Sequence, residues 1–133
     1  MSLSDIERKD LVKYRIEKAK ETFAEISVQI ENNFFRTAAN RMYYACYYAA
    51  TALLIKEGYE THSHKGVISL LGLHFIKENR IDKYLGNIYG KLFFLRLRGD
   101  YEDWVSIDED EVTQLLKPAE KFIITIENLI NEK

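Results

Sequence analysis

The side chains best suited to bind or act on a phosphate group stand together in one short segment of this chain. Arg96 and Arg98 are followed by Asp100 and Tyr101, after a stretch rich in apolar residues. An arginine near a hydrophobic core needs an anionic partner, because its charge is costly to bury alone. Either the arginines pair with nearby carboxylates, or Arg96 binds a phosphate in a groove with Asp100 and Tyr101 as orienting residues. The planar guanidinium suits both roles.

A second segment places an arginine beside a group of tyrosines. Arg41 lies three residues before Tyr44 and therefore shares a helix face with it, while Tyr47 and Tyr48 neighbour Tyr44 on the same helix. These side chains could form a stacking and hydrogen-bonding wall for a base or a phosphate. Alternatively, the rings fill the core or a dimer interface and their hydroxyls reach the edge. The candidate nucleotide- or RNA-binding residues are Arg41, Tyr44, Arg96 and Arg98.

The histidines and the single cysteine do not form a recognisable metal motif. His62 and His64 are two residues apart, which does not place them on one helix face, and His74 follows with no acidic residue between. Cys46 stands among alanines and tyrosines and is expected in the core, and a lone cysteine excludes an intrachain disulfide. The chain also lacks a glycine-rich phosphate loop and a nucleophile elbow. We therefore expect no metal and no cofactor.

The periodicity of apolar residues predicts five helices, which must position these side chains. The first covers 4–32, where Ser4 and Glu7 have the spacing of a capping box. The second covers 34–57 and is apolar on nearly all faces, which predicts a central position. Alanines recur along one side of this second helix and would let another helix approach closely. They are Ala38, Ala45, Ala49 and Ala52.

The third and fourth helices follow after short polar joints. The third is expected to run to about residue 79 from a cap at Thr61 or Ser63. The fourth begins after a cap at Asp82 and is expected to end near Arg98.

The fifth helix brings the chain to its C-terminal end. Ser106 and Glu109 repeat the capping-box spacing at its start, and apolar positions continue to residue 130. Pro118 lies inside this helix and removes one backbone hydrogen bond. We therefore expect a kink about one turn upstream, near Gln114.

Together these elements predict an all-α, antiparallel, up-and-down bundle that forms one domain over residues 1–133. The N-terminus is charged and lacks the apolar region of a secretory signal, and no stretch reaches the length of a membrane span. We therefore expect a cytoplasmic protein that does not bind membranes.

The charge of the chain is unevenly distributed. Residues 1–100 hold 16 Lys and Arg against 12 Asp and Glu, whereas residues 101–133 hold 3 against 9. This pattern argues against a uniform nucleic-acid-binding surface. A local basic site, or a basic face that meets an acidic segment of another chain, remains open.

In their order and spacing, four segments resemble the HEPN domain, and in particular its small stand-alone prokaryotic members. The segments are 40–45, 61–67, 74–78 and 96–101. The resemblance implies an antiparallel helical bundle that is usually a dimer and is commonly paired with a minimal nucleotidyltransferase in a toxin–antitoxin arrangement. Many HEPN toxins are metal-independent ribonucleases, in which an arginine is followed four to six residues later by a histidine. Tyr101 would correspond to the tyrosine that such a nucleotidyltransferase adenylylates.

This chain departs from the ribonuclease motif at the histidine. The window after Arg96 holds Asp100, Tyr101 and Glu102, and neither His62 nor His64 could approach except from another helix. The resemblance therefore implies a non-catalytic or weakly catalytic dimeric partner of a nucleotidyltransferase, with a nucleotide- or RNA-binding cleft. One alternative is a metal-independent ribonuclease that uses Arg96 with Asp100 or Tyr101. Another is a structural dimeric adaptor that binds no ligand.

Overall fold

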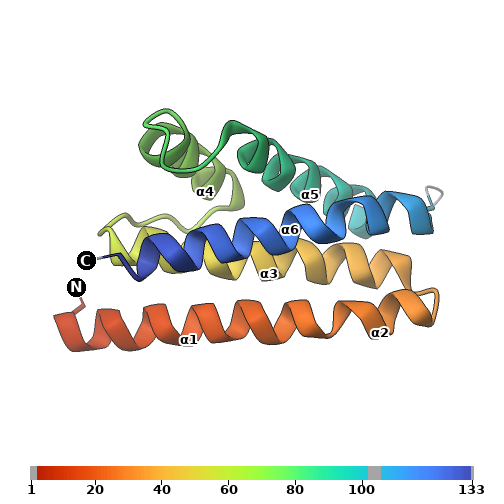
Figure 1. The fold of residues 1–133 in the computed structure, drawn as a ribbon, viewed down its shortest axis with the longest axis horizontal. Coiled ribbons are helices and arrows are strands. Elements are labelled where there is room, and N and C mark those ends of the chain that lie inside the picture. Colours follow the sequence, from red (N-terminus) through yellow and green to blue (C-terminus); the bar gives the residue numbers. More distant parts are fainter. Residues whose placement is uncertain (1–2, 102–105, 133) are drawn as a thin grey trace.

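The computed structural model of the protein describes residues 3–101 and 106–132, and within these ranges it contains helices and no strand. The predicted all-α antiparallel bundle is confirmed, and the first and last helices bring the two ends of the chain to the same end of the molecule (Figure 1). No helix in the described ranges has the length and apolar character needed to cross a lipid bilayer. The elements are α1 (Asp5–Ala24), α2 (Ile26–Glu31), α3 (Phe35–Lys56), α4 (His64–Leu71), a π-helical segment (Gly72–Ile76), α5 (Lys83–Tyr101) and α6 (Glu109–Ile130).

Helix α3 is the centre of the bundle, as its apolar pattern predicted. It packs against α1, α2, α4, α5 and α6. The four alanines of its stripe are fully buried, which lets neighbouring helices approach its backbone, and Cys46 is buried with them. Because the apolar surface of α3 is covered within one chain, it does not by itself require a second copy, and dimerisation stays a prediction.

The first predicted helix is in fact two helices. Ser4 caps α1 with the predicted capping box, in which Ser4 and Glu7 exchange hydrogen bonds of 3.1 Å. The helix ends at Ala24, and α2 begins again at Ile26 after a break at Glu25. Asn33 then turns the chain toward α3 with a left-handed φ of 62°, a conformation that asparagine tolerates better than most residues.

The third predicted helix is shorter in regular α form than its apolar pattern suggested. Its cap is Ser63, whose Oγ accepts a hydrogen bond of 2.9 Å from the backbone N–H of Gly66. Only eight residues are α-helical before the chain widens into the π-helical segment. A Cβ atom at Gly66 would lie 2.0 Å from Oγ1 of Thr61, so glycine allows the preceding loop to fold over the start of α4. This packing fixes the position of His64.

Helix α5 extends to Tyr101, beyond the predicted end at Arg98. The glycine at position 99 does not end it because this residue serves close packing instead. A Cβ atom there would lie 2.9 Å from Cδ1 of Ile107 and 3.3 Å from Cγ of Arg36. The extra turn keeps Asp100 in register with Arg96, one helical turn earlier.

The start of α6 corrects one prediction. Its cap is Asp108, whose Oδ1 accepts a hydrogen bond of 2.9 Å from the backbone N–H of Glu111, and not Ser106. The aspartate lies directly before the first helical turn and adds a negative charge at the positive end of the helix dipole. Pro118 lies inside a helix that continues to Ile130, and the bend near Gln114 stays a prediction.

The alanine stripe of α3 gives a direct test of this packing. Ala49→Leu should lower the free energy of unfolding by about 1–3 kcal/mol, because a larger side chain cannot enter a filled helix contact without strain. Urea unfolding followed by circular dichroism measures this loss. The exposed alanine of α1 supplies the matched control, and Ala24→Leu should change stability by less than about 0.5 kcal/mol. Equal effects of the two substitutions would contradict a close-packed stripe.

Candidate functional site

Arg96 is a buried cation at the contact between α5 and α3. Its residue surface is 7% exposed, and its guanidinium carbon lies 5.0 Å from the ring centre of Tyr43 and 5.5 Å from that of Tyr44. Its Nη1 pairs with Oδ2 of Asp100 at 3.5 Å and donates a hydrogen bond of 3.4 Å to the Tyr44 hydroxyl. The predicted proximity of Arg96 and Asp100 is therefore present in the structure, as an ion pair within one helix.

The contacts of Arg96 leave its hydrogen-bonding capacity partly unused. Both contacts of Nη1 are long for a charged hydrogen bond, which is typically about 2.7–2.9 Å. The Nε atom is buried and has no acceptor among the described residues. A buried donor without a partner costs stability. The guanidinium therefore keeps hydrogen-bonding capacity that the described residues do not use.

Two residues of α3 connect Arg96 to Arg41. The side-chain amide of Asn40 donates to the Asp100 carboxylate at 3.2 and 3.4 Å, and Asn40 Oδ1 accepts hydrogen bonds of 3.1 and 2.7 Å from Arg41. The Arg41 guanidinium also lies 5.1 Å from the ring centre of Tyr44. We call these connected residues the arginine cluster. They are Asn40, Arg41, Tyr44, Arg96 and Asp100.

His64 brings an imidazole to this cluster from the first residue of α4. Its Nδ1 lies 2.7 Å from the Tyr43 hydroxyl, and its ring centre is 4.7 Å from that of Tyr47. Partial burial, together with the positive charge of Arg96, lowers the pKa of His64 below 6.5. The ring is therefore neutral at pH 7. No histidine follows Arg96 closely in the sequence, but the fold places this one, from another helix, beside the tyrosines that contact Arg96.

Tyr43 holds this histidine from the core side. Its side chain is fully buried, and burial raises the pKa of its hydroxyl to about 12, so the phenol keeps its proton at neutral pH. When this phenol donates to Nδ1 of His64, the neutral imidazole carries its own proton on Nε2. The ring then has a fixed orientation and one N–H group for a ligand.

Two of the candidate residues lie apart from the arginine cluster. Arg98 forms a 2.8 Å ion pair with Glu111 of α6 and donates to the backbone carbonyl of Ser106 at 3.5 Å. Of the two roles considered for the arginines, Arg98 therefore has the first, which is pairing with nearby carboxylates. Tyr101 is the last residue of α5 and is 72% exposed.

Sequence reasoning missed three residues of the site as candidates. Asn40 and Tyr43 could have been found, because they share the helical spacing of Tyr44 and Tyr47. His64 could not, because its approach depends on the loop between α3 and α4. In the part of the chain that the structure describes, no three His, Cys, Asp or Glu side chains gather as metal ligands. Cys46 is enclosed in the core, and burial raises the pKa of its thiol.

Comparison with known proteins identifies relatives of similar length. A family model of the HEPN domain matches residues 12–129. A UPF0332 protein of Thermotoga maritima is 32% identical, with 95% of this chain and 96% of the relative covered. A protein of Methanocaldococcus jannaschii named "Putative toxin MJ0605" is 33% identical over 88% of this chain and 87% of its own. The crystal structure of TT1696 from Thermus thermophilus has the same fold, with a TM-score of 0.74, 15% identity, and coverage of 88% of this chain and 96% of that one.

The lowered pKa of His64 predicts a pH dependence of stability. His64 binds a proton more readily in the unfolded state than in the folded state. The contribution of His64 to the free energy of unfolding is therefore complete above pH 6.5 and declines as the pH falls below that value. Urea unfolding at about pH 8 and about pH 5 should therefore show a smaller loss of stability for His64→Gln than for the unchanged protein. Substitution of the exposed His62 by Gln is the matched control. If both substitutions reduced the loss of stability between these two pH values equally, this environment for His64 would be contradicted.

Proposed function

This chain belongs to the HEPN domain family, and we propose that it binds the phosphate groups of RNA or of a nucleotide at the arginine cluster. The observation that carries this proposal is the incompletely bonded Arg96, a buried guanidinium with two long contacts and an unpaired Nε. The cation is positioned before any ligand arrives, so little side-chain freedom would be lost on binding.

The surrounding residues suit a phosphodiester ligand. A phosphate could replace the long contact between Arg96 and Asp100 by paired, shorter hydrogen bonds. Asp100 would stay bonded to the Asn40 amide, which limits its repulsion of the ligand. The half-buried Tyr44 ring offers a face on which a base can stack, and Arg41 adds a second positive charge beside it.

We further propose that the protein acts in the cytoplasm as the HEPN component of a toxin–antitoxin pair. Two relatives carry names that contain the word toxin. The partner expected from the family resemblance is a minimal nucleotidyltransferase. The exposed Tyr101 is accessible to such an enzyme and would accept an adenylyl group on its hydroxyl.

RNA cleavage is a second candidate function, and His64 is the observation that favours it. In the other tautomer, in which Nδ1–H of His64 donates to the Tyr43 oxygen, the bare Nε2 could take the proton of a ribose 2′-hydroxyl, whose oxygen attacks the adjacent phosphorus and expels the 5′-oxygen. Arg96 would stabilise the charge on the phosphorane oxygens. The 5′-oxygen must leave with a proton, and one imidazole would have to return it. We therefore expect slow cleavage, independent of metal.

Binding is tested with labelled single-stranded RNA by fluorescence anisotropy. Arg96→Ala should weaken binding at least about tenfold, because a charge-assisted hydrogen bond to the phosphate is lost. Arg96→Lys keeps the charge but not the paired donors, so its affinity for RNA should lie between that of the unchanged protein and that of Arg96→Ala. Arg80→Ala removes an arginine paired with Glu57 on another part of the surface and should bind as the unchanged protein does. Equal affinity of all four proteins would remove Arg96 from the site.

Cleavage is tested by incubating the same proteins, together with His64→Gln, with mixed cellular RNA in the presence of EDTA. We expect little or no product over the time in which binding is complete. Rapid cleavage that persists in EDTA and is lost in both Arg96→Ala and His64→Gln would favour the ribonuclease over the binding function. Circular dichroism shows whether each variant keeps its helices.

The family resemblance also predicts a dimer, and α5 offers a surface for it. Tyr84 and Phe94 are exposed and line a shallow groove beside Gly90, where a Cβ atom added to the glycine would face open space. Light scattering at micromolar concentration should give twice the chain mass of 15.7 kDa. Phe94→Glu should shift this mass toward that of the single chain, since a charge would enter an apolar contact. A monomer mass for the unchanged protein would contradict the dimer.

A further inference from the structure

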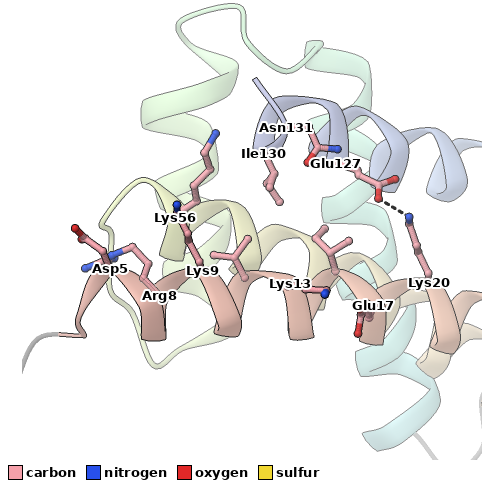
Figure 2. A pocket seen from close by; sticks show the side chains of 12 residues that line it. Asp5, Arg8, Lys9, Lys13, Glu17, Lys20, Lys56, Glu127, Ile130 and Asn131 are labelled. Atoms are coloured by element: carbon pink, nitrogen blue, oxygen red, sulfur yellow. Dashed lines mark ion pairs between the residues drawn. The ribbon is translucent and has the colours of Figure 1, made fainter. Parts of the chain in front are cut away.

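A long groove separates α1 from α6, two helices that do not contribute to the arginine cluster. Both helices pack on α3, but they contact each other far less, and the space between them is open to solvent. The groove consists of two hollows of about 600 and 420 Å³ that share Lys20 and Glu127 as lining residues. These two side chains form an ion pair across the groove (Figure 2).

The floor of each hollow is apolar. In the first hollow it is formed by Val12, Ile16 and Ile130, and in the second by Phe23, Leu116, Ile123 and Ile124. Ile124 is 49% exposed. The side of the groove formed by α1 and the start of α2 extends from Asp5 to Ser27, which at the rise of a helix is roughly 30 Å. These dimensions match a helix of about 20 residues better than a small molecule.

The rim of the first hollow is basic. Five cationic side chains line it against three carboxylates, and Figure 2 shows several of them at the open end near Asp5. Three cations already have partners: Arg8 donates to the carbonyl of Ile55, Lys56 to that of Leu129, and Lys20 pairs with Glu127. The remaining two, Lys9 and Lys13, are exposed and have no ion-pair partner among the described residues.

We propose that this groove binds an amphipathic α-helix of a partner protein, with acidic residues placed beside Lys9 and Lys13. A helix laid between α1 and α6 would cover the apolar floor and complete a four-helix arrangement with α3. The unpaired lysines favour a partner helix that carries negative charge. They also set the direction in which that helix lies along the groove, because the second hollow lacks a comparable basic rim. This proposal does not depend on the arginine cluster.

The probe for this site is a synthetic helical peptide of about 20 residues with a labelled end. It carries leucines along one face and four glutamates beside that face in one half, and two matched peptides carry glutamines or lysines in place of the glutamates. The acidic peptide should bind in the micromolar range. The glutamine peptide should bind about tenfold more weakly, and the lysine peptide should not bind measurably.

Protein variants locate the binding. The double substitution Lys9→Glu and Lys13→Glu should weaken acidic-peptide binding at least about tenfold, and Ile124→Glu should weaken it as well. The matched control reverses two exposed lysines outside the groove, Lys77→Glu and Lys83→Glu, and should change affinity less than about twofold. All positions changed are exposed, and circular dichroism confirms that the helices are kept.

Five outcomes would overturn the proposal. Four of them are equal affinity for the three peptides, absence of saturable binding, unchanged affinity in the Lys9 and Lys13 variant, and a change in the oligomeric mass of that variant, which would make the groove an interface between copies. Loss of RNA binding in the same variant would assign the groove to RNA and would also overturn it. Arg96→Ala should bind the acidic peptide as the unchanged protein does, so that failure of the RNA-binding function is distinguished from failure of this one.

Discussion

The burial of one guanidinium is the constraint on which the site depends. Arg96 lies within the contact between α3 and α5, where its charge needs compensation that water cannot supply. The compensation comes from Asp100, one turn later, and from the aromatic faces of Tyr43 and Tyr44. Both sources require regular helix. If α5 ended at the predicted position, Asp100 would lose its register with Arg96. Helix α3 continues without a break past Tyr43 and Tyr44, and this regular backbone directs both rings toward Arg96.

The same charge contributes to the state of the imidazole beside it. Partial burial, together with the charge of Arg96, lowers the pKa of His64, and the Tyr43 phenol fixes its ring. This imidazole belongs to the first residue of α4 and reaches the tyrosines of α3 from there. The position of that residue depends on Ser63 as a helix cap and on Gly66, whose missing side chain leaves room for Thr61. The turn before α4 therefore determines where the imidazole lies.

Much of the fold could be predicted from periodicity, because α3 is apolar on nearly all faces and only a central helix can be. The break at Glu25 and the π-helical segment could not, since the apolar spacing continues through both. In the site, the pairing of Arg96 with Asp100 follows from helical spacing. The pairing of Arg98 with Glu111 joins α5 to α6, and its signal in the sequence is the group of acids that follows Arg98. The approach of His64 and the groove between α1 and α6 depend on how helices pack, which spacing along one helix does not encode.

The most direct test of Arg96 as the anion-binding residue is nuclear magnetic resonance of the arginine side-chain N–H groups. The Nε–H of Arg96 should have its own resonance, and titration with a short single-stranded RNA should shift that resonance in a saturable manner, because the group gains an acceptor it lacks in the free protein. The resonance should be missing from the Arg96→Lys protein, which assigns it. An Arg96 resonance that stays unchanged while the RNA binds elsewhere would contradict the account.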